Sequence, residues 1–220
     1  DPVSWHRPLR SISTHAPSSP RTFKTRIDPL GCVWDKPRPM KLCYVFEKGR
    51  ADGDRDMKEL LGGKGANLAE MCRLGAPVPP GFTLPTSLCK RFYDDGGRLA
   101  DDVLAAIDQG MAHIERSLGN LRFGDPERPL LVSVRSGAPA SMPGMMDTIL
   151  NLGLTTATVE GLAATTKNRR FALDSYRRLI QMYGDVVKGV DSHALEAPMT
   201  ERKAARGVAV DADLTADDLQ

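Results

Sequence analysis

The sequence has few cysteines, few aromatic residues, no excess of one charge and no long apolar run. Its four cysteines form no C-x-x-C pair, and no histidine stands at zinc-finger spacing from them, so neither a disulfide framework nor a zinc site is expected. Because the formal net charge is only +2, the composition indicates neither nucleic acid nor an anionic membrane as a partner. No apolar stretch approaches the roughly 20 residues of a membrane-spanning helix. These absences predict a soluble globular protein with reduced, structural thiols.

The residues that are present divide the chain into two parts, at about residue 40. Residues 1–40 are rich in Pro, Ser and Arg, carry both tryptophans and show neither a helical nor a strand period, so we predict a disordered extension. Arginine and serine with few acidic residues are also typical of transit peptides. A plastid or other organelle therefore stays open as an alternative to a cytoplasmic location. Residues 41–220 are expected to form the folded domain.

Hydrophobic periodicity in residues 41–220 predicts a mixture of helices and strands, an α+β class of fold. The clearest helix covers residues 100–118, where apolar residues recur every three or four positions. Further helices are expected at 64–74, 86–94, 157–166 and 169–188. Strands are expected at 42–46, 129–134 and 149–150. Thr86 is placed to cap the helix that it begins, the strand at 129–134 is expected to be buried, and the tail after Asp211 resembles a loop that enters a helix.

The first segment that could bind a ligand or take part in catalysis is the turn Gly62-Gly63-Lys64-Gly65 at the start of a predicted helix. Glycines at this point let backbone N–H groups approach a phosphate, and a lysine adds a mobile positive charge. The turn is not a Walker A loop, since Lys58 stands where the first glycine belongs and Gly65 follows the lysine. From spacing alone, a flexible connection with a solvated lysine is the favoured interpretation.

The second segment joins a strand to a long loop. The predicted strand ends at Arg135, a guanidinium suited to bidentate phosphate binding, although an internal ion pair would serve it as well. The loop that follows, residues 136–148, contains two glycines and three methionines. Those methionines could line an adenine slot or belong to the core.

Long blocks of the sequence resemble one known family. Leu60–Met71 (L-L-G-G-K-G-A-N-L-A-E-M) resembles the opening signature of the family of pyruvate, phosphate dikinases and phosphoenolpyruvate synthases. Ser133–Ala138 followed by Ala140–Leu154 is similar to the pyruvate, phosphate dikinases in particular, and a third block lies at 171–183. The likeness covers residues 41–220, and residues 1–40 show none.

The resemblance implies the N-terminal portion of an ATP-grasp-type nucleotide-binding domain, incomplete at its C-terminal end. In this family the domain uses ATP and inorganic phosphate to phosphorylate a histidine on a separate domain, and it releases AMP and pyrophosphate. The phosphohistidine then converts pyruvate to phosphoenolpyruvate on a third domain. The resemblance implies catalytic roles for Lys64 and Arg135 on the ATP phosphates. It implies nucleotide contacts from Gly62, Gly63, Gly65, Ser136, Gly144, Met145, Met146, Asp147 and Thr148.

The resemblance also implies what should lie elsewhere. Mg²⁺ is expected to take part, but its ligands, the carrier histidine and the pyruvate site are expected beyond Gln220, and no residue of this chain is assigned to a metal. Pro139 departs from the family pattern, which has a longer, often basic residue there. Two alternatives remain: a phosphoenolpyruvate synthase-like enzyme, whose family lacks the M-P-G-M-M-D-T loop, and a truncated, non-catalytic product that keeps the nucleotide-binding fold.

Overall fold

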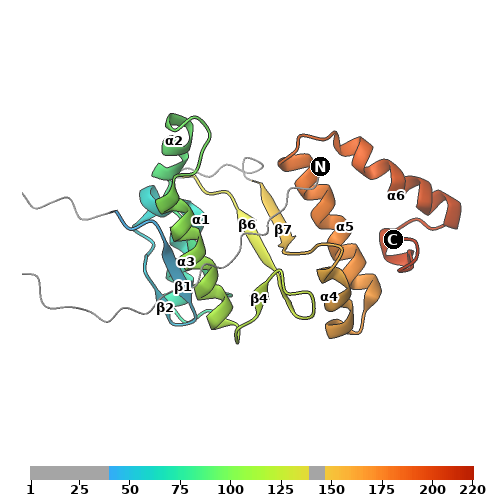
Figure 1. Ribbon diagram of the computed structural model, residues 1–220, viewed down its shortest axis with the longest axis horizontal. Helices are drawn as coiled ribbons and strands as arrows, with labels where there is room; N and C mark the ends of the chain where they lie inside the picture. The colour runs from blue at the N-terminus through green and yellow to red at the C-terminus, as the bar shows by residue number, and fades with distance from the viewer. Residues whose placement is uncertain (1–39, 139–146) are drawn as a thin grey trace, which may run out of the picture. The chain divides into compact units, whose positions relative to one another are not determined.

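The computed structural model describes residues 40–138 and 147–220 (Figure 1). Residues 41–220 form one compact unit. Its helices and small sheets alternate along the chain, which confirms the predicted mixture of helix and strand. None of the helices in the described part of the chain is long and apolar enough to cross a membrane.

A three-stranded antiparallel sheet opens the unit. Its strands are β1 (Tyr44–Glu47), β2 (Arg50–Ala51) and β3 (Gly81–Thr83), in the order β2-β1-β3. Helices α1 (Lys58–Arg73) and α3 (Asp101–Ser117) pack against this sheet, and α2 (Ser87–Asp94) connects β3 to α3. Gly110 permits the close approach of α3, since a Cβ there would lie 2.4 Å from the ring of Phe82.

The middle of the unit consists of two short strand pairs. Strands β4 (Arg122–Phe123) and β5 (Pro129–Leu130) run parallel, whereas β6 (Val132–Arg135) and β7 (Thr148–Leu152) form an antiparallel hairpin (Figure 1). The predicted continuous buried strand at 129–134 is therefore wrong. The strand is interrupted at Leu131, between β5 and β6. Leu130 is buried, whereas Val134 is 49% exposed. Among the described residues β6 pairs with β7 alone, so one strand pair cannot enclose the side chains of both faces.

Helices form the C-terminal part. Helix α4 (Thr158–Thr166) and helix α5 (Arg169–Val186) bury Val159 and Ala163 against Ala172 and Leu173. Between them, Lys167 adopts the left-handed conformation and the side chain of Asn168 caps α5 by accepting a hydrogen bond from a backbone N–H. Helix α5 also packs on β7. These two helices confirm the predictions at 157–166 and 169–188.

Helix α6 (Ser192–Arg206) was not predicted from the sequence. None of its residues is buried and Pro198 lies inside it, so it has no apolar stripe to reveal it. The residues that could have predicted this helix lie at its ends: Asp191 caps the first turn, and Gly207 ends the helix in the left-handed conformation. The helix expected after Asp211 is instead one 3-10 turn, η1 (Asp211–Asp213).

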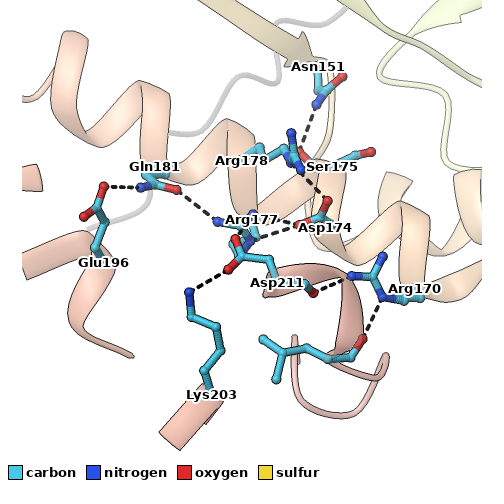
Figure 2. A network of polar contacts seen from close by, with 11 residues as sticks. Asn151, Arg170, Asp174, Ser175, Arg177, Arg178, Gln181, Glu196, Lys203 and Asp211 are labelled. Carbon is cyan, nitrogen blue, oxygen red and sulfur yellow. Dashed lines mark hydrogen bonds and ion pairs between the residues drawn. The ribbon is translucent and has the colours of Figure 1, made fainter. Parts of the chain in front are cut away.

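Polar contacts join α6 and the 3-10 turn to α5 (Figure 2). Arg177 donates to Asp174 at 2.8 Å, and its guanidinium also lies 3.5 Å from the carboxylate of Asp211. Lys203 of α6 donates to Asp211 at 2.8 Å. The hydrogen bond from Lys203 holds the pKa of Asp211 below its ordinary value, despite an opposing effect of burial. A charged network therefore takes part in docking α6 on α5, beside the packing of Leu195 against Gly184.

Candidate functional site

The glycine turn interrupts α1 at Gly62. That residue has φ 70° and ψ 164°, a backbone conformation that is essentially restricted to glycine. The helix is therefore one turn from Lys58 to Leu61 followed, after the kink, by a regular segment from Gly63 to Arg73. The sequence predicted only the second segment, because it begins where the apolar period begins. Lys64 is the second residue after the kink.

The turn contacts the segment that follows β6, although more than 70 residues separate them in the sequence. The N–H of Gly63 donates to the carbonyl of Ala138 at 3.1 Å. A Cβ on Gly62 would lie 3.3 Å from the backbone N and O of Ala138 and 3.4 Å from the carbonyl carbon of Gly137. Gly62 is therefore required by both conformation and space. The two segments that the sequence marked separately meet through their backbones.

The N–H of Gly63 was predicted to face a nucleotide phosphate, and here it binds a protein carbonyl. Whether it also serves a nucleotide stays a prediction. Because one backbone donor of the turn already has an acceptor, more of any phosphate recognition falls to the lysine side chain.

Thr86, which directly precedes α2, also holds the turn. The N–H of Thr86 donates to the carbonyl of Leu60 at 2.8 Å, and its hydroxyl donates to the carbonyl of Glu59 at 2.6 Å. Thr83 packs under Gly65, where a Cβ would lie 2.7 Å from the methyl group of Thr83. The prediction that Thr86 caps α2 with its side chain is wrong, since its hydroxyl is directed at Glu59 and makes no cap hydrogen bond.

The β6–β7 hairpin brings predicted site residues together at the end of the strands where its loop begins and ends. Arg135 is opposite Thr148 in the strand register. Both the N–H and the hydroxyl of Ser136 donate to the carbonyl of Asp147 at 3.2 Å, which closes the base of the loop. The other predicted loop residues, Gly144, Met145 and Met146, lie outside the described residues, as does Pro139.

The two predicted catalytic cations have no carboxylate partner in residues 40–138 and 147–220. Lys64 is half-buried and Arg135 is exposed, and neither side chain makes an ion pair or a hydrogen bond to another described residue. The sequence left open whether Arg135 binds an external anion or an internal carboxylate. In the part of the chain that the structure describes, no internal carboxylate pairs with it.

Two cavities lie away from these cations. One, of about 360 Å³, lies among α4, α5 and α6 and is lined by Arg169, Tyr176 and Leu195, among others. The second, of about 330 Å³, is lined by Cys43, which directly precedes β1, and by Asp102 of α3, among others. Within the described ranges, no group of three or more His, Cys, Asp or Glu residues is placed to hold a metal ion.

Comparison with known proteins identifies relatives of the whole chain. Residues 58–122 match the family described as pyruvate phosphate dikinase, AMP/ATP-binding domain. A chloroplastic pyruvate, phosphate dikinase of Mesembryanthemum crystallinum is 46% identical over 219 residues, which cover 100% of this chain and 21% of the relative. The pyruvate, phosphate dikinase of Clostridium symbiosum is 53% identical over 180 residues, or 82% of the chain and 20% of the relative.

These matches confirm the resemblance and extend it. The chain spans about a fifth of the length of the relatives that it matches. The family match at 58–122 includes Lys64 but ends before Arg135. The expectation that residues 1–40 resemble nothing known is wrong, because the match to the Mesembryanthemum crystallinum protein runs through them. Composition alone could not reveal that likeness, since this segment has no period or motif.

Proposed function

We propose that this chain is the N-terminal part of the ATP-binding domain of a pyruvate, phosphate dikinase, with an ATP-grasp type of fold. The complete enzyme would convert ATP, inorganic phosphate and pyruvate to AMP, pyrophosphate and phosphoenolpyruvate through a phosphohistidine. The identity of 46–53% to dikinases supports this proposal. The observation that carries it is the contact of the Gly62–Gly63 turn with the Gly137–Ala138 segment, since it joins two segments to which we assign phosphate binding.

Lys64 and Arg135 have the chemistry that a triphosphate needs. Transfer of a phosphoryl group relies on positioning and on neutralising charge around the phosphorus. The ammonium of Lys64 acts as a compact point charge, and the guanidinium of Arg135 can bind two phosphate oxygens with parallel hydrogen bonds. Neither cation is neutralised by a described carboxylate, so both keep their charge for an anionic ligand.

The remaining assignments follow the same proposal. Ser136, Asp147 and Thr148 stand at the base of the loop, where Gly144, Met145 and Met146 would reach the nucleotide. Mg²⁺ would neutralise phosphate oxygens when bound, and the resemblance to the dikinases is the ground for assigning its ligands to other parts of the enzyme. The partners are ATP, phosphate and the enzyme's phosphohistidine and pyruvate-binding domains, with no nucleic acid and no membrane.

For the location we propose the cytoplasm, with a plastid as the alternative that the composition of residues 1–40 and their match to a chloroplastic relative support. Other chloroplastic relatives match 180 residues, as the bacterial protein of Clostridium symbiosum does, so the extent of the match does not separate the two locations.

The 220-residue polypeptide expressed by itself is a separate case. Because it spans about a fifth of the length of the dikinases that it matches, we expect it to bind ATP weakly and to have no dikinase turnover. Phosphoenolpyruvate formation by the purified polypeptide would contradict this expectation. The phosphoenolpyruvate synthase alternative is weakened, since the relatives reported above are named as dikinases.

The test of the proposal separates the two half-reactions in the full-length protein that carries this chain. Lys64→Ala or Arg135→Ala should slow the ATP-dependent phosphorylation about 100-fold, a usual cost for removing one donor to transition-state charge. Phosphoryl exchange between pyruvate and phosphoenolpyruvate should not change. Lys58→Ala and Arg128→Ala, which remove exposed cations nearby in sequence, serve as controls. Equal losses in both half-reactions, or none in either, would refute the assigned roles.

A further inference from the structure

The kink at Gly62 takes the helical donor away from a carbonyl of α1. In an uninterrupted helix, the carbonyls of Glu59 and Leu60 would accept from the N–H groups of Gly63 and Lys64, four residues later. The N–H of Gly63 instead donates to Ala138. A backbone carbonyl that loses its partner must find another donor or remain exposed to water.

Thr86 supplies a donor to each of these carbonyls. Its hydroxyl donates to Glu59 at 2.6 Å and its N–H donates to Leu60 at 2.8 Å. A single residue, directly before α2, therefore holds the last turn before the kink through consecutive carbonyls. This use of the hydroxyl also explains why Thr86 does not cap its own helix.

We propose that Thr86 is a positioning residue for Lys64, an inference that rests on the proposed function. Lys64 lies two residues after Gly62, so its direction depends on how the segment before the kink is fixed. The turn is held by hydrogen bonds to Ala138 and to Thr86. Because phosphoryl transfer depends on placing charge accurately, loosening one of these attachments should reduce the rate without changing the charge.

Two substitutions isolate the hydroxyl. Thr86→Val keeps the branched shape and the N–H but removes the donor to Glu59, whereas Thr86→Ser keeps the donor. In the full-length protein, Thr86→Val should slow the ATP half-reaction about five- to tenfold, the equivalent of one hydrogen bond. Thr86→Ser should stay within about twofold of the original rate. The exchange between pyruvate and phosphoenolpyruvate should be unaffected by either.

A matched control exists in α4. The hydroxyl of Thr166 donates to the carbonyl of Leu162 at 2.7 Å, a bond of the same kind at an exposed place. Thr166→Val should therefore leave both half-reactions unchanged. Amide hydrogen exchange adds a readout that does not need turnover: the N–H of Gly63 should exchange faster in Thr86→Val and at the original rate in Thr166→Val.

A double substitution shows whether Thr86 acts through Lys64. If it does, adding Thr86→Val to Lys64→Ala should cause no further loss in the ATP half-reaction. An equal loss in both backgrounds, or a normal rate and normal exchange in Thr86→Val alone, would overturn the positioning role. A slow Lys64→Ala variant beside a normal Thr86→Val variant would overturn this inference and leave the proposed function standing. A normal Lys64→Ala variant would overturn both.

Discussion

Two adjacent glycines of α1 should respond in opposite directions when each is replaced by alanine. Gly62 occupies the kink, with φ 70° and ψ 164°, whereas Gly63 has helical geometry. A Cβ on Gly62 would lie 3.3 Å from the backbone of Ala138, and a Cβ on Gly63 would meet no atom within 4 Å. The two variants thus add the same methyl group to neighbouring positions in different environments.

The structure sets the sign and size of each effect. Alanine at position 62 must adopt a conformation that costs about 1–3 kcal/mol, and crowding against Ala138 adds to it. Alanine at position 63 keeps the N–H and reduces the entropy of the unfolded chain, so it should stabilise the helix by about 0.5–1 kcal/mol. The free energies of unfolding should therefore differ by at least about 1.5 kcal/mol, or roughly 3 °C or more in thermal midpoint.

Urea unfolding of the 220-residue chain, followed by circular dichroism, measures this difference directly. The original protein should lie between the two variants, with Gly62→Ala the least stable. Equal midpoints for the two variants, or a more stable Gly62→Ala, would refute the conformational account of the kink. A change in the denaturant slope would show that the variants differ in compactness, and calorimetry would then replace the extrapolation.

Three further predictions concern other parts of the chain. Gly161→Ala would place a Cβ 2.0 Å from the carbonyl oxygen of Pro126, so thermal unfolding should show a loss of about 1–3 kcal/mol; an unchanged midpoint would refute this packing. A hydrogen bond from Arg206 holds the pKa of Asp218 well below its ordinary value, so the stabilisation is complete above about pH 4 and is lost as the pH falls through the lowered pKa. Calorimetry between pH 6 and pH 2 should show this loss, and Asp218→Asn should remove it. Cys89 is exposed, whereas burial raises the pKa of Cys43 and Cys72, so mass spectrometry after brief alkylation should find Cys89 modified before Cys43 and Cys72.

The sequence predicts those helices that dock through apolar side chains. Residues 100–118 carry a continuous apolar period, and α3 occupies Asp101–Ser117. Residues 192–206 carry none, because α6 attaches through charged contacts such as Lys203 to Asp211. Helical periodicity reports burial of one face, so a helix fixed mainly by ion pairs is visible only through its caps.

The strand at 129–134 shows a different limit. Its run of apolar residues indicates burial on both faces, and Leu130 is indeed buried. Val134 is exposed because β6 has only β7 beside it among the described residues. An apolar pattern shows that a strand can be buried on both faces, whereas its actual exposure depends on which other segments pack against it.

In the candidate site, too, the sequence shows some features and only the tertiary structure shows the others. A glycine turn with a lysine and a strand that ends in an arginine can each be identified from the residues alone. That Gly63 contacts Ala138, and that Thr86 holds the turn through Glu59 and Leu60, follows only from tertiary structure. The motif suggested that backbone N–H groups of the turn serve the phosphates, yet the protein itself uses one of them. Because the backbone of the turn is engaged in holding its own shape, the charge for a triphosphate is expected to come chiefly from the side chains of Lys64 and Arg135.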